Sequence, residues 1–193
     1  MALLSTRLGV LVSGRGSNLG AILQAIDEGR LCATVAAVVS DHRDAGALAR
    51  VSGRKECAVF VVERGAYPQQ GEFEDKIAEC LEGERVDLVV LAGFMRVLSG
   101  PFVRRFAGRI INIHPSLLPS FPGLHAQRQA LLHGVKVAGC TVHMVDETLD
   151  GGQILAQAAV PVLPDDTEET LSARILAEEH RILPETIARV FTT

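Results

Sequence analysis

Two polar side chains, Asn112 and His114, stand at the end of the hydrophobic stretch "RIINIH" (109–114). Alternate residues of a β-strand point to the same face of a sheet, so this amide and this imidazole project together. Prolines at positions 115, 119 and 122 then restrict the backbone of the following loop. An amide and an imidazole aimed at one point can hold a small polar group, such as a developing oxyanion, between them.

A carboxylate for this pair is available in "LDGGQIL" (149–155), where Asp150 precedes two glycines that allow a sharp turn. A turn aspartate often only caps local backbone, and the residues alone leave that alternative open. If Asp150 folds back on His114, its charge favours the protonated imidazole and fixes the ring orientation. The three side chains would then move protons and stabilise an oxyanion. No G-x-S-x-G elbow is present, and neither Ser116 nor Cys140 has a nucleophile setting, so covalent catalysis is not expected.

A glycine-rich loop, "SGRGSNLGAIL" (13–23), joins the first predicted strand to the first predicted helix. Its glycines allow backbone angles closed to other residues and leave room for a ligand. The helix N-terminus adds unpaired N–H groups and a positive dipole end. We therefore expect a single phosphate monoester at Gly16, Ser17 and Asn18, with the last two also able to cap the helix.

Two other interpretations of this loop stay open. The dinucleotide fingerprint G-x-G-x-x-G would need glycine at position 19, where the chain has Leu19, with Gly20 one residue late. Asp41 follows the second predicted strand, where an acidic residue can bind the ribose of NAD, so NAD binding stays a weaker alternative. A glycine turn that binds no ligand is the remaining possibility.

The histidines and cysteines do not predict a metal site. The six histidines contain no H-E-x-x-H motif or comparable close pair, and the four cysteines lie far apart. His125 and His133 are expected on the surface, and His143, inside "TVHMV", is interpreted as a hydrogen-bonded core residue. The cysteines are expected to be small core residues in a reducing compartment.

The elements that must position these side chains alternate through the first half of the chain. Short apolar runs at 8–13, 34–40, 58–62 and 86–93 are typical of buried strands. Helical spacing of apolar residues lies between them, at positions 19, 22, 23 and 26 and again at 73, 77, 80 and 81. Such a β-α-β alternation predicts a parallel sheet with right-handed crossovers.

The second half has a different pattern. A fifth strand (109–114) is followed by a short helix (126–134) that ends at Gly134. Two longer runs, "VAGCTVHMV" and "QILAQAAVPV", flank the acidic turn "DETLDGG" and predict an antiparallel pair added to the sheet. A last helix is expected from about Asp166, as N-cap with Glu169 behind it, to about Phe191, with a bend at Pro184.

The prediction is therefore an α/β, Rossmann-like fold with a mostly parallel twisted sheet, helices on both faces and an antiparallel extension in the C-terminal half. We expect one domain over 1–193, with a phosphate-binding half (1–100) and a catalytic half (101–193). The 193 residues are 48% apolar and 22% charged, with a net charge of −4, so no basic surface predicts nucleic-acid binding. No signal peptide and no apolar run long enough for a membrane span is apparent, and a cytoplasmic protein is expected.

Four segments occur together in an order that resembles a known family: "GRGSN", "LAGFMRVLS" (91–99), "NIHPSLLPSFPG" (112–123) and "VHMVDETLDGGQI" (142–154). They resemble the phosphoribosylglycinamide formyltransferase family of purine biosynthesis over nearly the whole chain. The resemblance implies direct transfer of a formyl group from 10-formyltetrahydrofolate, as cosubstrate and without a metal, to the amino group of 5-phosphoribosylglycinamide. The partners would be these small molecules, with no nucleic acid or membrane, and the protein a monomer or homodimer.

The resemblance also implies roles for individual residues. Catalysis falls to Asn112, His114 and Asp150. The ribonucleotide is assigned to Gly16, Ser17, Asn18 and Glu179. The folate is assigned to Met95, Arg96, Val97, Leu98, Asn112, Asp146, Glu147 and Asp150. Some relatives add an arginine toward the folate; its nearest match here is Gln70, and Arg64 is a second possibility.

Three other kinds of protein are alternatives to this family. Formyltetrahydrofolate hydrolases carry an N-terminal regulatory domain, for which the seven residues before the first strand are expected to leave no room. Methionyl-tRNA formyltransferases usually have a residue other than proline after the catalytic histidine, whereas Pro115 follows His114 here. They also carry a C-terminal tRNA-binding domain, which is not expected in this chain. A non-catalytic nucleotide-binding module would use the glycine loop alone and leave Asn112, His114 and Asp150 unexplained.

Overall fold

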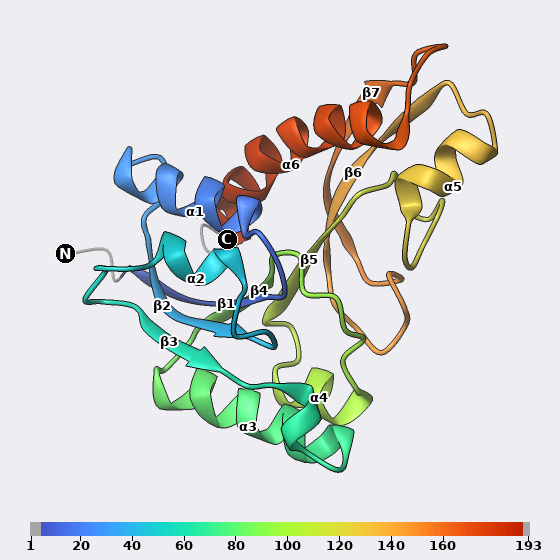
Figure 1. Ribbon diagram of the computed structural model, residues 1–193. Helices are drawn as coiled ribbons and strands as arrows, with labels where there is room; N and C mark the ends of the chain where they lie inside the picture. The colour runs from blue at the N-terminus through green and yellow to red at the C-terminus, as the bar shows by residue number, and fades with distance from the viewer. Residues whose placement is uncertain (1–4, 191–193) are drawn as a thin grey trace.

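The computed structural model describes residues 5–190, and one seven-stranded sheet runs through it in the order β3-β2-β1-β4-β5-β6-β7 (Figure 1). The strands are β1 (Thr6–Val12), β2 (Ala33–Ser40), β3 (Ala58–Val61), β4 (Leu88–Leu91), β5 (Ile110–His114), β6 (Val137–Met144) and β7 (Ile154–Pro161). The helices are α1 (Ser17–Asp27), α2 (Gly46–Arg50), α3 (Gln70–Gly83), α4 (Gly100–Arg105), α5 (Ala126–Leu132) and α6 (Glu168–Val190), with a short 3-10 turn at Arg64–Ala66.

Strands β1 to β5 are parallel, as the alternation of apolar runs and helical patterns predicts. The central strands are covered on both faces, which is why they consist of nearly unbroken apolar residues. Strand β3 differs from the prediction of a buried strand, because Val59 and Val61 are 46% and 40% exposed. It is one of the two edge strands, and the burial of its residues alternates, so only the face that carries Phe60 packs on the core.

The antiparallel extension is confirmed: β6 pairs antiparallel with β5, and β7 with β6. The pairing of β6 with β7 is close at Gly139, where an added Cβ would lie 2.0 Å from the carbonyl oxygen of Ala158. The predicted fold class, a mostly parallel sheet with helices on both faces and an antiparallel extension, is therefore what the chain forms.

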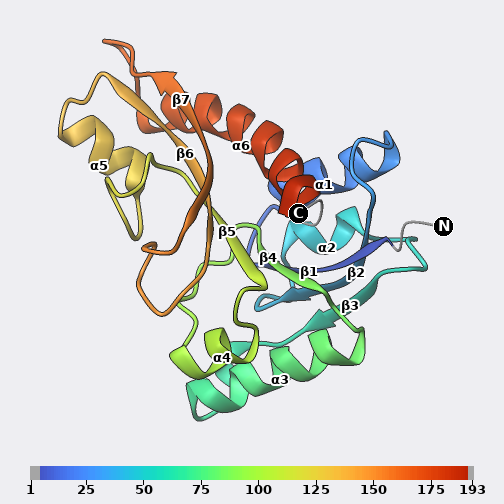
Figure 2. The same ribbon diagram turned by 180° about the vertical axis from the view of Figure 1, so that it is seen from behind.

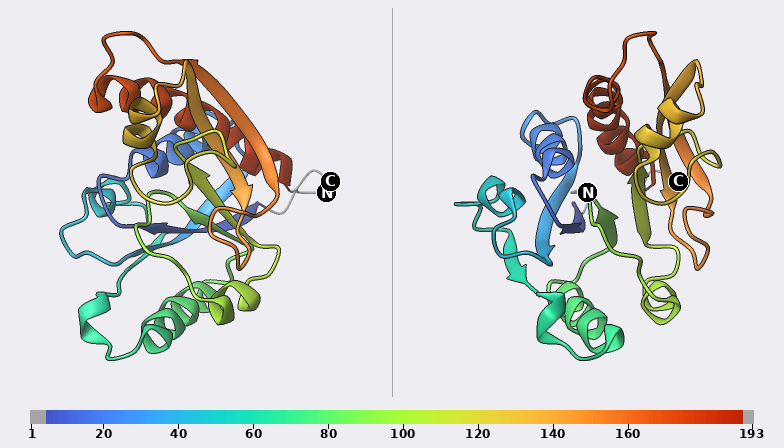
Figure 3. Two further views of the ribbon diagram at one scale, coloured as in Figure 1. Left: turned by 90° about the vertical axis from the view of Figure 1, so that its right-hand side faces the viewer. Right: turned by 45° about the vertical axis from the view of Figure 1, so that its right-hand side comes forward.

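The helices lie in two layers (Figure 2). Buried residues of α1, α2, α5 and α6 belong to one apolar cluster on one face of the sheet, and those of α3 and α4 belong to a second cluster on the other face. Figure 3 shows α3 and α4 together on the side of the sheet away from α1 and α6. Each helix presents one apolar stripe, which must be buried against the sheet to stabilise it.

The last helix begins one residue later than predicted. Thr167, not Asp166, caps it: the backbone N–H of Thr170 donates to Thr167 Oγ1 at 3.3 Å. Asp166 instead forms an ion pair with Arg174 at 2.7 Å and accepts a hydrogen bond from the N–H of Leu163. The helix continues through Pro184 to Val190, and the predicted end at Phe191 lies outside the described residues.

The strand order reverses between β1 and β4, the neighbours at the centre of the sheet. In open α/β sheets, ligands bind beyond the carboxyl ends of the strands at such a point. The glycine loop follows β1, the segment with Met95 follows β4, and His114 ends β5. No helix between residues 5 and 190 is long and apolar enough to span a membrane.

Candidate active site

The strand β5 and its antiparallel neighbour β6 together carry the polar side chains at the centre of the site. Asn112 lies opposite His143 in the register, and His114 lies opposite Thr141. Side chains of directly opposed residues in an antiparallel pair project to the same face of the sheet. Because Asn112 and His114 are two residues apart, both reach this face, and His143 joins them from the neighbouring strand.

Asp150 reaches the same face from the turn between β6 and β7. Its backbone has φ of +50°, an uncommon conformation for a residue with a side chain. Gly152 allows this turn to close, since an added Cβ there would lie 1.9 Å from the carbonyl oxygen of Met144. The glycines after Asp150 therefore bring its carboxylate back over the sheet.

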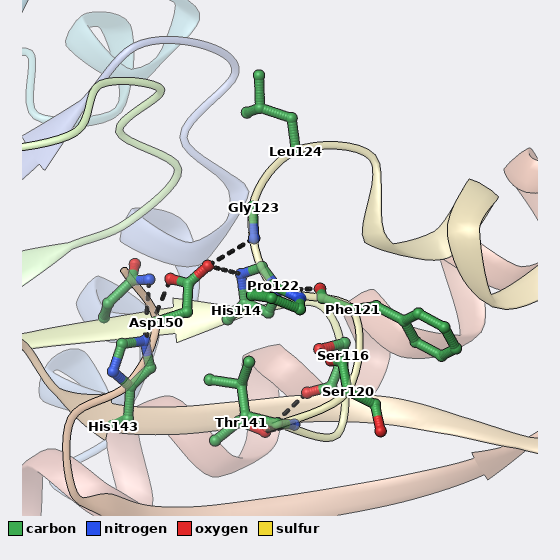
Figure 4. A network of polar contacts seen from close by, with 12 residues as sticks. His114, Ser116, Ser120, Phe121, Pro122, Gly123, Leu124, Thr141, His143 and Asp150 are labelled. Atoms are coloured by element: carbon green, nitrogen blue, oxygen red, sulfur yellow. Dashed lines mark hydrogen bonds and ion pairs between the residues drawn. The ribbon is translucent and has the colours of Figure 1, made fainter. Parts of the chain in front are cut away.

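The carboxylate of Asp150 lies between two imidazole rings (Figure 4). Its Oδ2 is 3.5 Å from His114 Nδ1 and accepts a 2.8 Å hydrogen bond from the N–H of Gly123. Its Oδ1 is 3.7 Å from His143 Nε2. Both His114 and Asp150 have side chains that are about nine-tenths buried, so the charge of this pair is poorly screened by water.

The contacts of His114 indicate which of its two ring nitrogens can exchange a proton with a substrate. Its Nε2 lies 2.9 Å from the carbonyl oxygen of Phe121, and a carbonyl only accepts, so Nε2 carries a proton. Its Nδ1 faces Asp150. A second proton on Nδ1 gives an imidazolium beside a carboxylate, so Nδ1 is the nitrogen placed to donate and recover a proton.

His143 is a buried residue with hydrogen bonds at both ring nitrogens, as predicted, and it also belongs to the site. Its Nδ1 donates to the carbonyl oxygen of Met144 at 2.8 Å, so a neutral ring leaves Nε2 as an acceptor for the Nδ2 amide of Asn112 at 3.2 Å. Burial lowers the pKa of His143 below its ordinary value, which favours this neutral form. The ring therefore fixes the Asn112 amide, leaving its second N–H free to bind an oxygen.

Sequence reasoning missed this contact because it depends on strand register. The polar residue in "TVHMV" was the available signal, since His143 and Thr141 alternate on one face of β6 as Asn112 and His114 do on β5. Only the pairing of the two strands places one set beside the other.

The proline-rich loop after β5 is held against β6 and β7. Thr141 Oγ1 donates to the carbonyl oxygen of Ser116 at 2.7 Å and accepts from the N–H of Leu118 at 3.0 Å. Gln157 Nε2 donates to the carbonyl oxygen of Leu118 at 2.9 Å. These contacts fix the loop whose Phe121 carbonyl and Gly123 N–H bind His114 and Asp150.

The glycine loop opens α1 through its backbone rather than through a side-chain cap. The N-cap is Gly16, with φ of +69° and no side-chain capping hydrogen bond, so the expectation that Ser17 or Asn18 caps the helix is wrong. An added Cβ at Gly16 would lie 2.5 Å from the Cβ of Ala47. The amides of Ser17, Asn18 and Leu19 are the first of the helix and have no intrahelical acceptor, which suits an anion.

The side chain of Asn18 is bound within the protein. It is 7% exposed, and its Nδ2 donates to Glu179 Oε2 on α6 at 2.8 Å. Burial raises the pKa of Glu179, and the hydrogen bond from Asn18 lowers it by less. The structure thus brings together Asn18 and Glu179, two of the residues assigned to the ribonucleotide, which lie 161 positions apart in the sequence.

The residues assigned to the folate form two neighbouring segments. Between β4 and α4, Met95 and Val97 are 68% and 69% exposed, whereas Leu98 packs partly on the core. In the turn after β6, Asp146 Oδ1 accepts from the N–H of Thr148, and Glu147 forms a 2.6 Å ion pair with Arg104 of α4. That ion pair lies beside Gly100, at the end of the first segment.

Gln70 and Arg64, the two possible counterparts of the arginine that some relatives place toward the folate, both make hydrogen bonds to other residues of this chain. Gln70 Nε2 donates to Glu74 Oε1 at 2.8 Å and to the carbonyl oxygen of Val97 at 3.1 Å. Arg64 Nη1 donates to the carbonyl oxygen of Tyr67 at 2.5 Å. The part of the chain that the structure describes contains no group of three or more histidine, cysteine, aspartate or glutamate residues arranged to hold a metal ion.

Comparison with known proteins relates this site to one family. Residues 6–187 match the model of the formyl transferase family. The chain is 43% identical over 175 residues to the phosphoribosylglycinamide formyltransferase of Escherichia coli, covering 91% of this chain and 82% of that one. It is 46% identical to the trifunctional purine biosynthetic protein adenosine-3 of Drosophila melanogaster over 94% of this chain but spans only 14% of that longer protein.

Solved structures agree with the sequence comparisons. The glycinamide ribonucleotide transformylase 1 of Symbiobacterium toebii is 55% identical, with a TM-score of 0.92, over 95% of this chain and 86% of that one. The phosphoribosylglycinamide formyltransferase of Bacillus halodurans is 41% identical, with a TM-score of 0.93, over 97% of this chain and 96% of that one.

Proposed function

The chain belongs to the formyl transferase family, and on that premise we propose that it transfers a formyl group to the amino group of 5-phosphoribosylglycinamide in purine biosynthesis. The formyl donor in this proposal is 10-formyltetrahydrofolate. The observation that carries the proposal is the meeting of Asn112, His114 and Asp150 at the end of β5. A helix N-terminus suited to a phosphate follows β1, which only β4 separates from β5 in the sheet.

The reaction requires one bond to form and one to break. The amine nitrogen attacks the formyl carbon, whose oxygen gains negative charge, and the bond to N10 of the folate then breaks. The amine loses one proton and N10 gains one, so the protons balance without a metal or redox step. A site for this chemistry needs donors for the oxygen and a group that moves a proton.

The geometry supports a role for each catalytic residue. Asn112, oriented by His143, offers an N–H to the developing oxyanion. His114 offers the Nδ1 proton beside it, and Asp150 stabilises the imidazolium that this requires. We propose that Asp150 also orders the water through which the amine proton leaves.

The two substrates would lie on either side of these residues. The amides of Ser17 and Asn18, after Gly16, suit the ribonucleotide phosphate, with Glu179 at the ribose. The exposed apolar surface of Met95 and Val97, beside the 146–150 turn, suits a flat heterocycle such as the pteridine ring. We propose that the protein works in the cytoplasm as a monomer or homodimer.

A formyl-transfer assay tests this proposal. Purified protein supplied with 10-formyltetrahydrofolate should release tetrahydrofolate only when the ribonucleotide is added, one molecule for each formylated product. Release without ribonucleotide would indicate a hydrolase, and transfer to methionyl-tRNA would indicate the tRNA enzyme. Binding of NAD with no release under either condition would favour a nucleotide-binding module.

A further inference from the structure

The segment from Met95 to Ser99, between β4 and α4, is irregular and yet carries most of the proposed folate wall. Its apolar side chains at 95 and 97 face solvent, so packing on the core does not determine their positions. An irregular segment without such packing keeps one conformation only if its backbone groups are bound by other parts of the chain. Side chains from three other elements do this.

Glu74 of α3 makes the largest set of these contacts. Its side chain is in the protein interior, and the residue is 3% exposed. Its Oε1 accepts hydrogen bonds from the backbone N–H of Ser99 and from Gln70 Nε2, both at 2.8 Å, and its Oε2 accepts a short one from Ser99 Oγ. A buried carboxylate is costly unless it is hydrogen-bonded, and here all three partners hold or border the segment.

Gln70 extends this network to the middle of the segment. The same Nε2 group that donates to Glu74 also donates to the carbonyl oxygen of Val97 at 3.1 Å. Val97 and Ser99 are therefore tied to one turn of α3 through residues four positions apart. Residues at this spacing lie on the same face of a helix, so α3 presents both groups together.

The other end of the segment is also held. The N–H of Met95 donates to Ser13 Oγ at 2.9 Å, and Arg96 Nε donates to Asp41 Oδ2 at 2.5 Å. Asp41 is 4% exposed. Ser13 and Asp41 follow β1 and β2, so they position the start of the segment, and Gln70 and Glu74 position its end.

We infer that Glu74 and Gln70 are positioning residues for the folate: they set the backbone of 95–99 before the ligand arrives and thereby determine the affinity for the folate. This inference rests on the proposed function. Neither residue needs to touch either substrate, and both lie on α3, which contributes none of the proposed catalytic groups. Preorganisation of a binding segment lowers the entropy lost on binding and so increases affinity.

Glu74→Leu tests the inference, because leucine has a similar volume but accepts no hydrogen bond. We expect the KM for 10-formyltetrahydrofolate and the Kd of a folate analogue to rise by about tenfold or more, as the loss of hydrogen bonds to a charged group implies. The KM for the ribonucleotide and kcat should change by less than about threefold. Glu74→Gln keeps an acceptor for Ser99 N–H and should restore most of the affinity.

Hydrogen exchange of the ligand-free protein gives an independent measurement. In Glu74→Leu the amides of 95–99 should exchange faster, while those of β4 and β5 stay protected. Ile77→Val is the matched control, since it removes a methyl group from a fully buried residue of the same helix without altering the network. It should leave both the exchange at 95–99 and the folate affinity unchanged.

The outcomes separate this inference from the proposed function. If wild-type protein transfers formyl groups but Glu74→Leu leaves exchange and folate affinity unchanged, the positioning role is wrong. If wild-type protein neither binds folate nor transfers a formyl group, the proposed function is wrong. The positioning role for the folate is then wrong as well, even if the amides of 95–99 exchange faster in Glu74→Leu. Should Glu74→Leu not fold, the double variant Gln70→Ala/Ser99→Ala removes the contacts of Gln70 Nε2 with Glu74 and Val97 and that of Ser99 Oγ with Glu74. Only the backbone N–H of Ser99 then still binds Glu74, and the expected and contradicting results are the same.

Discussion

At the scale of single residues, the environment of each carboxylate determines its role. Asp150 accepts a hydrogen bond from the amide of Gly123 and lies 3.5 Å from His114 Nδ1, the nitrogen placed to carry a proton. Glu179 has one hydrogen bond, from Asn18, and burial raises its pKa. The first group is suited to supporting a proton transfer, whereas the second retains a proton more readily than an exposed glutamate does.

Asp150→Asn should abolish most turnover while keeping the shape of the site. Asparagine still accepts the hydrogen bond from Gly123 but cannot stabilise an imidazolium at His114. We expect kcat to fall by about a hundred- to ten-thousand-fold. Calorimetry should find ribonucleotide affinity changed by less than about tenfold, or about 1.4 kcal/mol. A nearly normal kcat with weakened binding would make Asp150 a binding or turn residue instead.

Glu179 should make stability depend on pH. Its pKa is higher in the folded than in the unfolded chain, so the folded state binds the proton more tightly. Stability from this group is therefore fully present below the ordinary glutamate value of 4.5 and is lost as pH rises through the raised pKa. Denaturant unfolding of Glu179→Gln, whose side chain never ionises, should show wild type losing stability relative to the variant as pH increases from 4 toward 8. Parallel curves for the two proteins would contradict this account.

At the scale of elements, the glycine loop depends on the left-handed backbone of Gly16, and the turn after β6 depends on the space that Gly152 leaves for the carbonyl oxygen of Met144. Gly16 has φ of +69° and lies against Ala47, whereas Gly14 in the same loop has open space around its Cβ position. The two glycines therefore offer a matched pair of positions in one loop.

Gly16→Ala should weaken ribonucleotide binding. The new Cβ would meet the Cβ of Ala47 at 2.5 Å, so the loop must move and the amides of Ser17 and Asn18 move with it. We expect steady-state kinetics to show a rise in KM for the ribonucleotide of about tenfold or more, and a far smaller rise for the folate. Gly14→Ala is the control and should behave as wild type. Equal effects on both substrates in a folded Gly16→Ala protein would argue against a phosphate at this loop.

At the scale of the whole molecule, the proposed binding surfaces follow three adjacent strands, β1, β4 and β5, where the order of the sheet reverses. The two proposed pockets are separate but neighbouring, since the N–H of Met95 bonds to Ser13 at the start of the glycine loop. The proposed catalytic residues lie at the end of β5 and in the turn between β6 and β7, so the antiparallel extension would be part of the site rather than an addition at the edge.

Crystals soaked with a folate analogue should show the pteridine ring against residues 95–98 and the 146–150 turn. The apolar surface of Met95 and Val97 and the nearby backbone groups provide the contacts that such a ring requires. Inorganic phosphate soaked into the same crystals should lie at the N-terminus of α1. Ring density in the glycine loop would overturn the assignment of the two pockets.

Local sequence patterns determined much of this protein. The alternation of apolar runs and helical spacing was enough to predict the parallel sheet, its helices and the antiparallel extension, because these patterns follow from repeats of two and about 3.6 residues. The spacing of Asn112 and His114 was enough to place both on one face of a strand. Glycines after Asp150 indicated a sharp turn, and the structure shows that Gly152 leaves room there for the carbonyl oxygen of Met144.

Only the tertiary structure decided which distant groups meet. His143 joins Asn112 because of the register between β5 and β6, and Asn18 meets Glu179 because α1 packs beside α6. Gln70, a candidate folate contact by sequence position, is instead bound to Glu74 and Val97. A residue's own neighbours in sequence limit its backbone conformation, but its partners depend on how whole elements pack, and a shift of one residue in a strand would turn each side chain to the opposite face.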